Sequence, residues 1–207
     1  MEGLPVRMAR IGGVGIALLL WAAMALPVAA HEQEVIRYGS FLGGFTHPVL
    51  GPDHLLAMLS VGILSTQIGG RAILTVPATF VVFMAIGGLV GIAYGGIPME
   101  VVEVGIAASV VVLGTIIAFA RRLPLPIIYG AVGFFGTMHG YAHGVETPSI
   151  AEPVLYALGF LAGTATIHLL GVLIGEVAKK YSAGIPALRS AGAGIAVMGA
   201  LFLAGIL

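Results

Sequence analysis

The stretch GFTHPVLGPDHLLAML, residues 44–59, decides how the chain folds. It interrupts an otherwise apolar sequence with polar and helix-breaking residues, namely His47, Pro48, Gly51, Pro52, Asp53 and His54. A proline inside a helix removes one backbone hydrogen bond and clashes with the preceding turn. The pattern therefore predicts a helix that breaks at 47–52 and restarts near Asp53, which we expect to cap the second piece.

Composition places the chain in a membrane. Of its 207 residues, 59% are hydrophobic and 9% are charged, whereas about 25% of residues are charged in an ordinary soluble domain. Basic and acidic residues number nine each, so the net charge does not indicate a nucleic-acid partner. Cysteine is absent, which excludes disulfides, thiolate metal sites and cysteine nucleophiles. We expect the protein to bind no nucleotide, because its sequence has no G-x-x-x-x-G-K-[ST] loop.

Residues 1–30 have the pattern of a secretory signal peptide. Basic residues precede the apolar run IGGVGIALLLWAAMAL, and the small residues Val28 and Ala30 occupy the cleavage positions. Cleavage would leave His31 as the mature N-terminus, outside the cytoplasm, and 31–207 as a single transmembrane domain. The alternative is an uncleaved first transmembrane helix, because the run is nearly long enough to span a bilayer.

Apolar segments recur along the rest of the chain at the length of about 20 residues that a helix needs to cross a bilayer. We expect spans at 53–69, 72–95, 99–120, 124–143, 153–178 and 186–207. A shorter apolar piece, VIRYGSFLGGF, precedes the broken stretch. The predicted fold is an all-α membrane protein, a bundle of six to seven transmembrane helices with a broken first helix, following the signal peptide.

Glycines recur at four-residue spacing within these spans. They are Gly87, Gly91 and Gly95, then Gly159 and Gly163, then Gly171 and Gly175. Small residues at this spacing allow helices to approach closely in lipid. We interpret them as packing seams and not as a binding feature. We find no long linker and no convincing internal repeat, so we expect one domain after the signal peptide.

Charged residues alternate between the connections of the predicted spans. The basic ones are Arg71, Arg121, Arg122, Lys179, Lys180 and Arg189. Short connections rich in lysine and arginine stay in the cytoplasm. The other connections carry Glu100, Glu103, Glu146 and Glu152. Together with the signal peptide, this predicts a multi-pass protein of the cytoplasmic (inner) membrane whose mature N-terminus lies outside.

Histidines and one aspartate indicate a metal site near the outer side. On a helix, His139 and His143 lie on one face, one turn apart, where they can hold one metal ion. Asp53 beside His54 is costly in an apolar site unless a cation compensates its charge. One more histidine lies deeper, within GTATIHLLG. The predicted metal ligands are His47, Asp53, His54, His139, His143 and His168.

Each of these residues also has a structural interpretation. His168 alone can be a hydrogen-bonded packing residue, and His139 and His143 can mark an exposed helix end. Met58 and Met138 offer thioethers, but we interpret both as gap-filling core residues. Imidazole and carboxylate without cysteine suit nickel, cobalt, zinc or copper(II), whereas calcium and magnesium prefer oxygen ligands.

Three motifs resemble one known family. HPVLGPDHLLAMLSVG, residues 47–62, is similar to the H-P-x-x-G-x-D-H-x-x-x-M-x-x-V-G signature of the HupE/UreJ membrane proteins, and every specified position matches. HGYAHGVE (139–146) resembles the second motif of that family, and GFLAGTATIHLLG (159–171) the third. The family is regarded as a set of nickel or cobalt permeases found with hydrogenase and urease systems. The resemblance implies that the first motif recognises metal, with the histidines of the other two as further ligands.

The expected function is a permease that captures a divalent transition metal ion outside, nickel or cobalt, with copper and zinc as alternatives. The ion would pass His168 toward Glu176, although Glu176 can instead pair with Lys179 or Lys180. The expected partners are the metal ion and the lipid bilayer. The sequence leaves open whether a second copy of the chain or metalloenzyme maturation proteins are also partners.

Two other classes of function stay open. One is a membrane-embedded metalloenzyme, although Gly140 stands where the H-E-x-x-H motif has its catalytic glutamate. The other is a metal-binding accessory protein, or a haem protein with paired histidines as axial ligands. We expect that the protein is not an enzyme, and we predict no catalytic residue.

Overall fold

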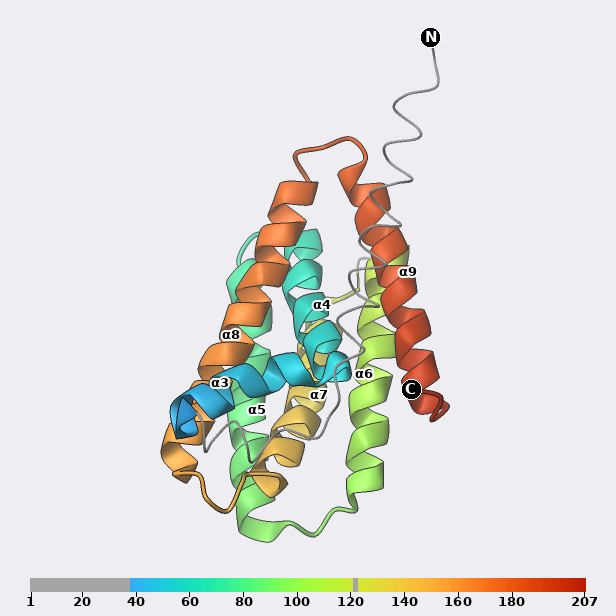
Figure 1. Cartoon of the computed structure of the whole chain (residues 1–207). Helices are drawn as coiled ribbons and strands as arrows, with labels where there is room; N and C mark the ends of the chain where they lie inside the picture. The colour runs from blue at the N-terminus through green and yellow to red at the C-terminus, as the bar shows by residue number, and fades with distance from the viewer. Residues whose placement is uncertain (1–37, 121–122) are drawn as a thin grey trace.

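The computed structural model describes residues 38–120 and 123–207, which form seven helices and no strand (Figure 1). The helices are α3 (Ser40–Leu50), α4 (Pro52–Ile68), α5 (Ala72–Tyr94), α6 (Met99–Phe119), α7 (Leu125–Val145), α8 (Pro153–Ala178) and α9 (Gly184–Leu203). The predicted signal peptide 1–30, its cleavage site and His31 lie outside the described residues, as do Arg121 and Arg122.

Six helices coincide with the predicted apolar segments. By length and composition, α5, α6, α8 and α9 can each cross a membrane, and the pair α3 and α4 adds a fifth span if it counts as one. The helix α7 is not among them, because histidines, threonine and several glycines interrupt its apolar residues. The chain is thus an all-helical multi-pass membrane protein, and the count of six to seven spans stays a prediction.

The predicted break lies between α3 and α4, whose axes bend by 84°. Figure 1 shows α3 lying across the bundle while α4 runs along it. Pro48 lies inside α3, so only Gly51 leaves the helical path. Pro52 begins α4, where its missing N–H costs no helical bond. The prediction that Asp53 caps α4 is wrong, because the capping position is Gly51 and Asp53 already lies inside the helix.

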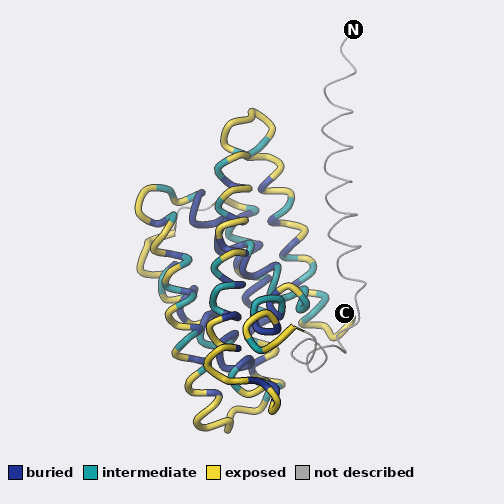
Figure 2. The backbone as a smooth tube through the Cα atoms, turned by 60° about the vertical axis from the view of Figure 1, so that its left-hand side comes forward, coloured by how far each residue is buried: buried dark blue, intermediate teal, exposed yellow. Residues whose placement is uncertain are grey.

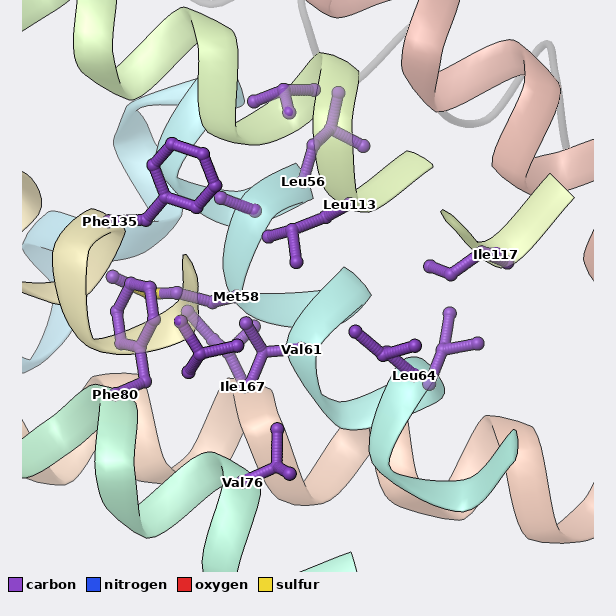
Figure 3. Close-up of a cluster of buried hydrophobic side chains, with 14 of the residues drawn as sticks. Leu56, Met58, Val61, Leu64, Val76, Phe80, Leu113, Ile117, Phe135 and Ile167 are labelled. Carbon is purple, nitrogen blue, oxygen red and sulfur yellow. The ribbon is translucent and has the colours of Figure 1, made fainter. Parts of the chain in front are cut away.

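The helix α4 is the centre of the bundle. From Leu56 to Thr66 every residue except Leu59 is buried, and α4 packs against α5, α6 and α8. Figure 3 shows its side chains among those of these neighbours. Met58 is fully buried in this core, and Met138 packs against a smaller cluster, as expected for gap-filling residues. These contacts fix the position of α4, whose first turn carries Asp53 and His54.

Large apolar side chains cover the outside of the bundle. Leu74 and Leu89 of α5 are 70% and 68% exposed, and Val154 of α8 is 70% exposed. Figure 2 shows buried residues along the inside of the bundle and exposed ones on its outer faces and ends. Such an extended apolar surface is expected where lipid surrounds a protein.

The prediction that the regularly spaced glycines allow close helix packing is confirmed. A Cβ atom at Gly87 would meet the backbone of Thr137 of α7, and one at Gly159 would meet Phe41 of α3. Gly95 is the exception, because it ends α5 with a φ of 48° and touches no neighbouring helix. The close approach of α5 to α7 and of α3 to α8 brings the histidine-bearing segments together.

Candidate metal centre

A cavity of about 530 Å³ opens beside the break between α3 and α4. Its polar lining comes from α3, α4, α6 and α7, and consists of His47, Asp53, His54, Glu100, Glu103, His143 and Glu146. The last residues of the chain, among them Phe202 and Leu203, contribute an apolar wall. The cavity thus combines imidazoles and carboxylates in a molecule that is otherwise apolar.

Four imidazoles from three helices form a row. The ring centroids of His47 and His143 lie 4.6 Å apart, those of His143 and His54 4.5 Å, and those of His54 and His139 4.6 Å. The bend at Gly51 places the last turn of α3 and the first turn of α4 against one face of α7. His139 and His143 are buried, so the alternative of an exposed helix end is wrong.

The outer part of the row contains a group with the spacing of a metal site. His47, His143 and Glu146 each offer one ligand atom, and these three atoms lie within 4.8 Å of one another. We call this group the outer triad. Glu146 is not among the metal ligands that the sequence predicts, although it follows His143 by three residues and caps the end of α7.

Tyr156 of α8 is a further neighbour that the sequence did not indicate. Its hydroxyl lies 2.9 Å from His47 Nδ1, and its side chain is buried. The contact depends on α8 packing against α3, for which no local pattern exists. A hydrogen bond to one ring nitrogen of a histidine orients the other toward a ligand.

Asp53 reaches the row through its neighbour. Its Oδ1 accepts a hydrogen bond from the backbone N–H of His54 at 2.8 Å and lies 2.8 Å from His54 Nδ1. We predicted Asp53 as a ligand, but one of its oxygens is engaged by this histidine. Carboxylate–histidine pairs of this kind commonly orient a metal-binding imidazole.

The inner part of the row is enclosed. His139 is fully buried, and its Nε2 lies 3.1 Å from Ser109 Oγ of α6. The ring of Phe80 of α5 then separates it from His168, with centroid distances of 5.3 Å and 5.1 Å. The structure thus brings five predicted residues together and leaves His168 one aromatic ring further into the core.

Several buried ring nitrogens in this region lack a hydrogen-bond partner within residues 38–120 and 123–207. They are His54 Nε2, His139 Nδ1 and both ring nitrogens of His168. Within these residues, His168 thus makes no hydrogen bond of the kind that the structural interpretation requires. An unsatisfied buried polar group costs about 1–3 kcal/mol. Lone pairs left open at this cost are suited to bind a cation.

Glu176 lies outside the site. Its Oε1 is 2.7 Å from Lys179 Nζ, and the pair is largely exposed. The ion pair expected as the alternative role of Glu176 is therefore present, and no contact connects it with the row of imidazoles.

The chain matches the family model described as HupE / UreJ protein over residues 16–202. This chain belongs to the HupE/UreJ family. It is also 40% identical over 184 residues to Protein HupE of Rhizobium leguminosarum bv. viciae, which covers 89% of this chain and 95% of that protein. No solved structure matches it. In this HupE/UreJ protein, the first two motifs supply the row of imidazoles and the third supplies His168.

Proposed function

We propose that this HupE/UreJ protein is a permease that moves a divalent transition metal ion, nickel or cobalt, across the cytoplasmic membrane. The observation that carries the proposal is the row of four imidazoles leading from an open cavity into the core. Imidazole nitrogens with a carboxylate suit first-row divalent metals. A solitary storage site would not need a row that continues toward a further buried histidine.

Capture begins at the cavity. Glu100 and Glu103 line it together with the outer triad, and their negative charge favours the entry of a cation. The outer triad then binds the ion with two nitrogens and one carboxylate oxygen. His143 touches both His47 and His54, so the ion can exchange one ligand at a time without losing all of them.

The path continues inward past Phe80 to His168. Beyond it, the turn between α4 and α5 and the loop between α8 and α9 lie at the upper end in Figure 1, and these connections carry Arg71, Lys179 and Lys180. The positive-inside rule supports the proposal that this end faces the cytoplasm. An inside-negative potential then favours entry of a divalent ion by about 4.6 kcal/mol per 100 mV.

The proposal includes the whole mature chain. Residues 31–207 form the transport domain, residues 1–30 are the signal peptide, and the mature N-terminus lies outside. His47, Asp53, His54, His139, His143 and His168 serve the metal ion, and Glu146 joins them. We propose transport without catalysis. A binding accessory protein would hold the same ion without moving it.

Transport is tested in proteoliposomes that contain the purified protein and a metal-quenched fluorophore. Under an inside-negative potential, nickel or cobalt added outside should quench the fluorophore with the wild-type protein and with Glu152→Gln. Glu152 is a matched control, because it is an exposed glutamate of the same connection as Glu146. His54→Ala should reduce the rate to that of empty liposomes. Wild-type protein that binds the metal without quenching would overturn the permease in favour of an accessory protein.

A further inference from the structure

Two buried ring nitrogens in the row of imidazoles, His139 Nδ1 and His54 Nε2, have no hydrogen-bond partner among the described residues. We propose that Ser109 is a positioning residue that sets the tautomer of His139, so that His139 Nδ1 and His54 Nε2 form an inner two-nitrogen binding position for the metal ion. The inference rests on the proposed function, because its ligand is the ion that the permease carries.

The proton positions follow from the contacts of Ser109. Its Oγ lies 2.6 Å from the carbonyl oxygen of Ile106 and 3.1 Å from His139 Nε2. Two oxygens this close share a proton, and only the hydroxyl has one to donate. The serine oxygen is therefore the acceptor for His139, whose Nε2 carries the hydrogen. The lone pair of the imidazole remains on Nδ1.

Asp53 sets the tautomer of His54 in the same manner. An ionised carboxylate can only accept hydrogen bonds, so the 2.8 Å contact with His54 Nδ1 places the hydrogen on that nitrogen. The lone pair of His54 then lies on Nε2. Both histidines thus present an open nitrogen, one positioned by a hydroxyl and the other by a carboxylate.

The open nitrogens share one enclosed environment. The two rings are in edge contact at 4.6 Å, and both open nitrogens are buried without a hydrogen-bond partner among the described residues. This inner position lacks the glutamate of the outer triad and so holds a divalent ion less strongly. Weak binding after strong capture lets an ion move on, because conduction requires that it can leave each site.

Ser65 of α4 is the matched control for Ser109. Both serines are fully buried. Ser65 Oγ donates to the carbonyl oxygen of Gly62 at 2.7 Å, the same bond to the residue three positions earlier that Ser109 makes. Only Ser109 also contacts a histidine. Replacement of either serine by alanine therefore removes the same bond to a helix carbonyl. Only Ser109→Ala also removes the hydrogen bond that fixes the tautomer of His139.

The first experiment measures cobalt binding to the purified full chain by visible absorption. The outer triad should fill first, and Ser109→Ala should weaken the affinity for the second, weaker cobalt ion about 10- to 100-fold, the usual cost of removing a group that orients a metal ligand. Ser65→Ala should leave it unchanged, and Ser109→Thr, which keeps the hydroxyl, should restore it. Equal affinity of Ser109→Ala and Ser65→Ala would overturn the inference.

The second experiment determines the tautomer directly. Nitrogen-15 NMR of histidine-labelled, metal-free wild-type protein should place the His139 hydrogen on Nε2 and the His54 hydrogen on Nδ1. The opposite tautomer at His139 would overturn the inference, and this measurement needs no variant that has to fold. Cobalt binding that depends on Ser109, in a protein that shows no uptake into liposomes, would overturn the permease and support the inner position.

Discussion

The two ends of α4 differ in whether their buried polar groups have hydrogen-bond partners. In its last turn, the hydroxyls of Ser65 and Thr66 each donate to a carbonyl of the same helix at 2.7 Å. In its first turn, His54 Nε2 is equally hidden and has no hydrogen-bond partner within the described residues. The buried hydroxyls of the last turn are therefore satisfied within the helix, whereas the first turn presents a ring nitrogen without a partner among the described residues.

The carboxylates differ in the same way between the two ends of the bundle. Glu176 forms an exposed ion pair with a lysine one turn away. Glu146 instead lies with two histidines from different helices. Polarity alone therefore does not mark a site in a membrane protein, whereas polar groups that converge from several helices do.

The largest effect, equal to that of His54→Ala, is expected from His143→Ala, because this imidazole touches both His47 and His54. Its loss removes a ligand from the outer triad and interrupts the row. Uptake into proteoliposomes should fall more than about 100-fold, beyond the range seen for groups that only orient ligands. The thermal midpoint of unfolding serves as the control for folding. Uptake within a few-fold of wild type would show that the row of imidazoles only packs the helices together and does not carry the ion.

Glu146→Gln should reduce uptake by about 10- to 100-fold, the range found for groups that support a metal site. A neutral amide oxygen remains, but the negative charge that stabilises a divalent ion is lost. The measurement is the initial rate of uptake at several metal concentrations, which should show weaker apparent affinity. Glu152→Gln, in the same connection, should behave as wild type. Equal effects of both variants would mean that only the overall surface charge matters.

Gly62→Ala tests the packed part of α4. The added Cβ would meet the backbone carbonyl of His168 and push α4 away from α8. The free energy of unfolding should fall by about 1–3 kcal/mol, as for overpacking in other cores. Gly130→Ala is the control, because a Cβ there meets nothing within 4 Å, and alanine favours helix over glycine. A loss of stability in the control as well would show that the seam is not the cause.

The smallest effect is expected from Glu176→Gln, which removes the exposed ion pair with Lys179. Exposed pairs contribute about 0–1 kcal/mol, so the thermal midpoint should change little. Metal uptake should stay within about twofold of wild type, a difference of less than 0.5 kcal/mol. A large loss of uptake would place Glu176 on the path of the ion and would remove the contrast between the two carboxylates.

Much of the fold could be predicted because its causes are local. The span at 153–178 coincides with α8, since the length of an apolar run and its flanking residues set where a membrane helix begins and ends. The predicted cap at Asp53 was wrong, because Pro52 begins the helix and leaves Gly51 as the capping residue. The sequence predicted five of the residues that the structure brings together, but it did not indicate Glu146, Ser109, Tyr156 or Phe80. Serine, tyrosine and phenylalanine are ordinary residues of such helices until a neighbour gives them a role.

Local sequence patterns were enough to predict a helical membrane protein, a helix break near Gly51 and two motifs that carry most of the histidines. Apolar length, proline and glycine act within a few residues, so no knowledge of distant contacts is needed. The folded arrangement was needed to see which buried ring nitrogens have no partner among the described residues and that Glu146 lies beside two histidines. These properties depend on contacts between helices that are far apart in the chain, and an 84° bend brings those helices together.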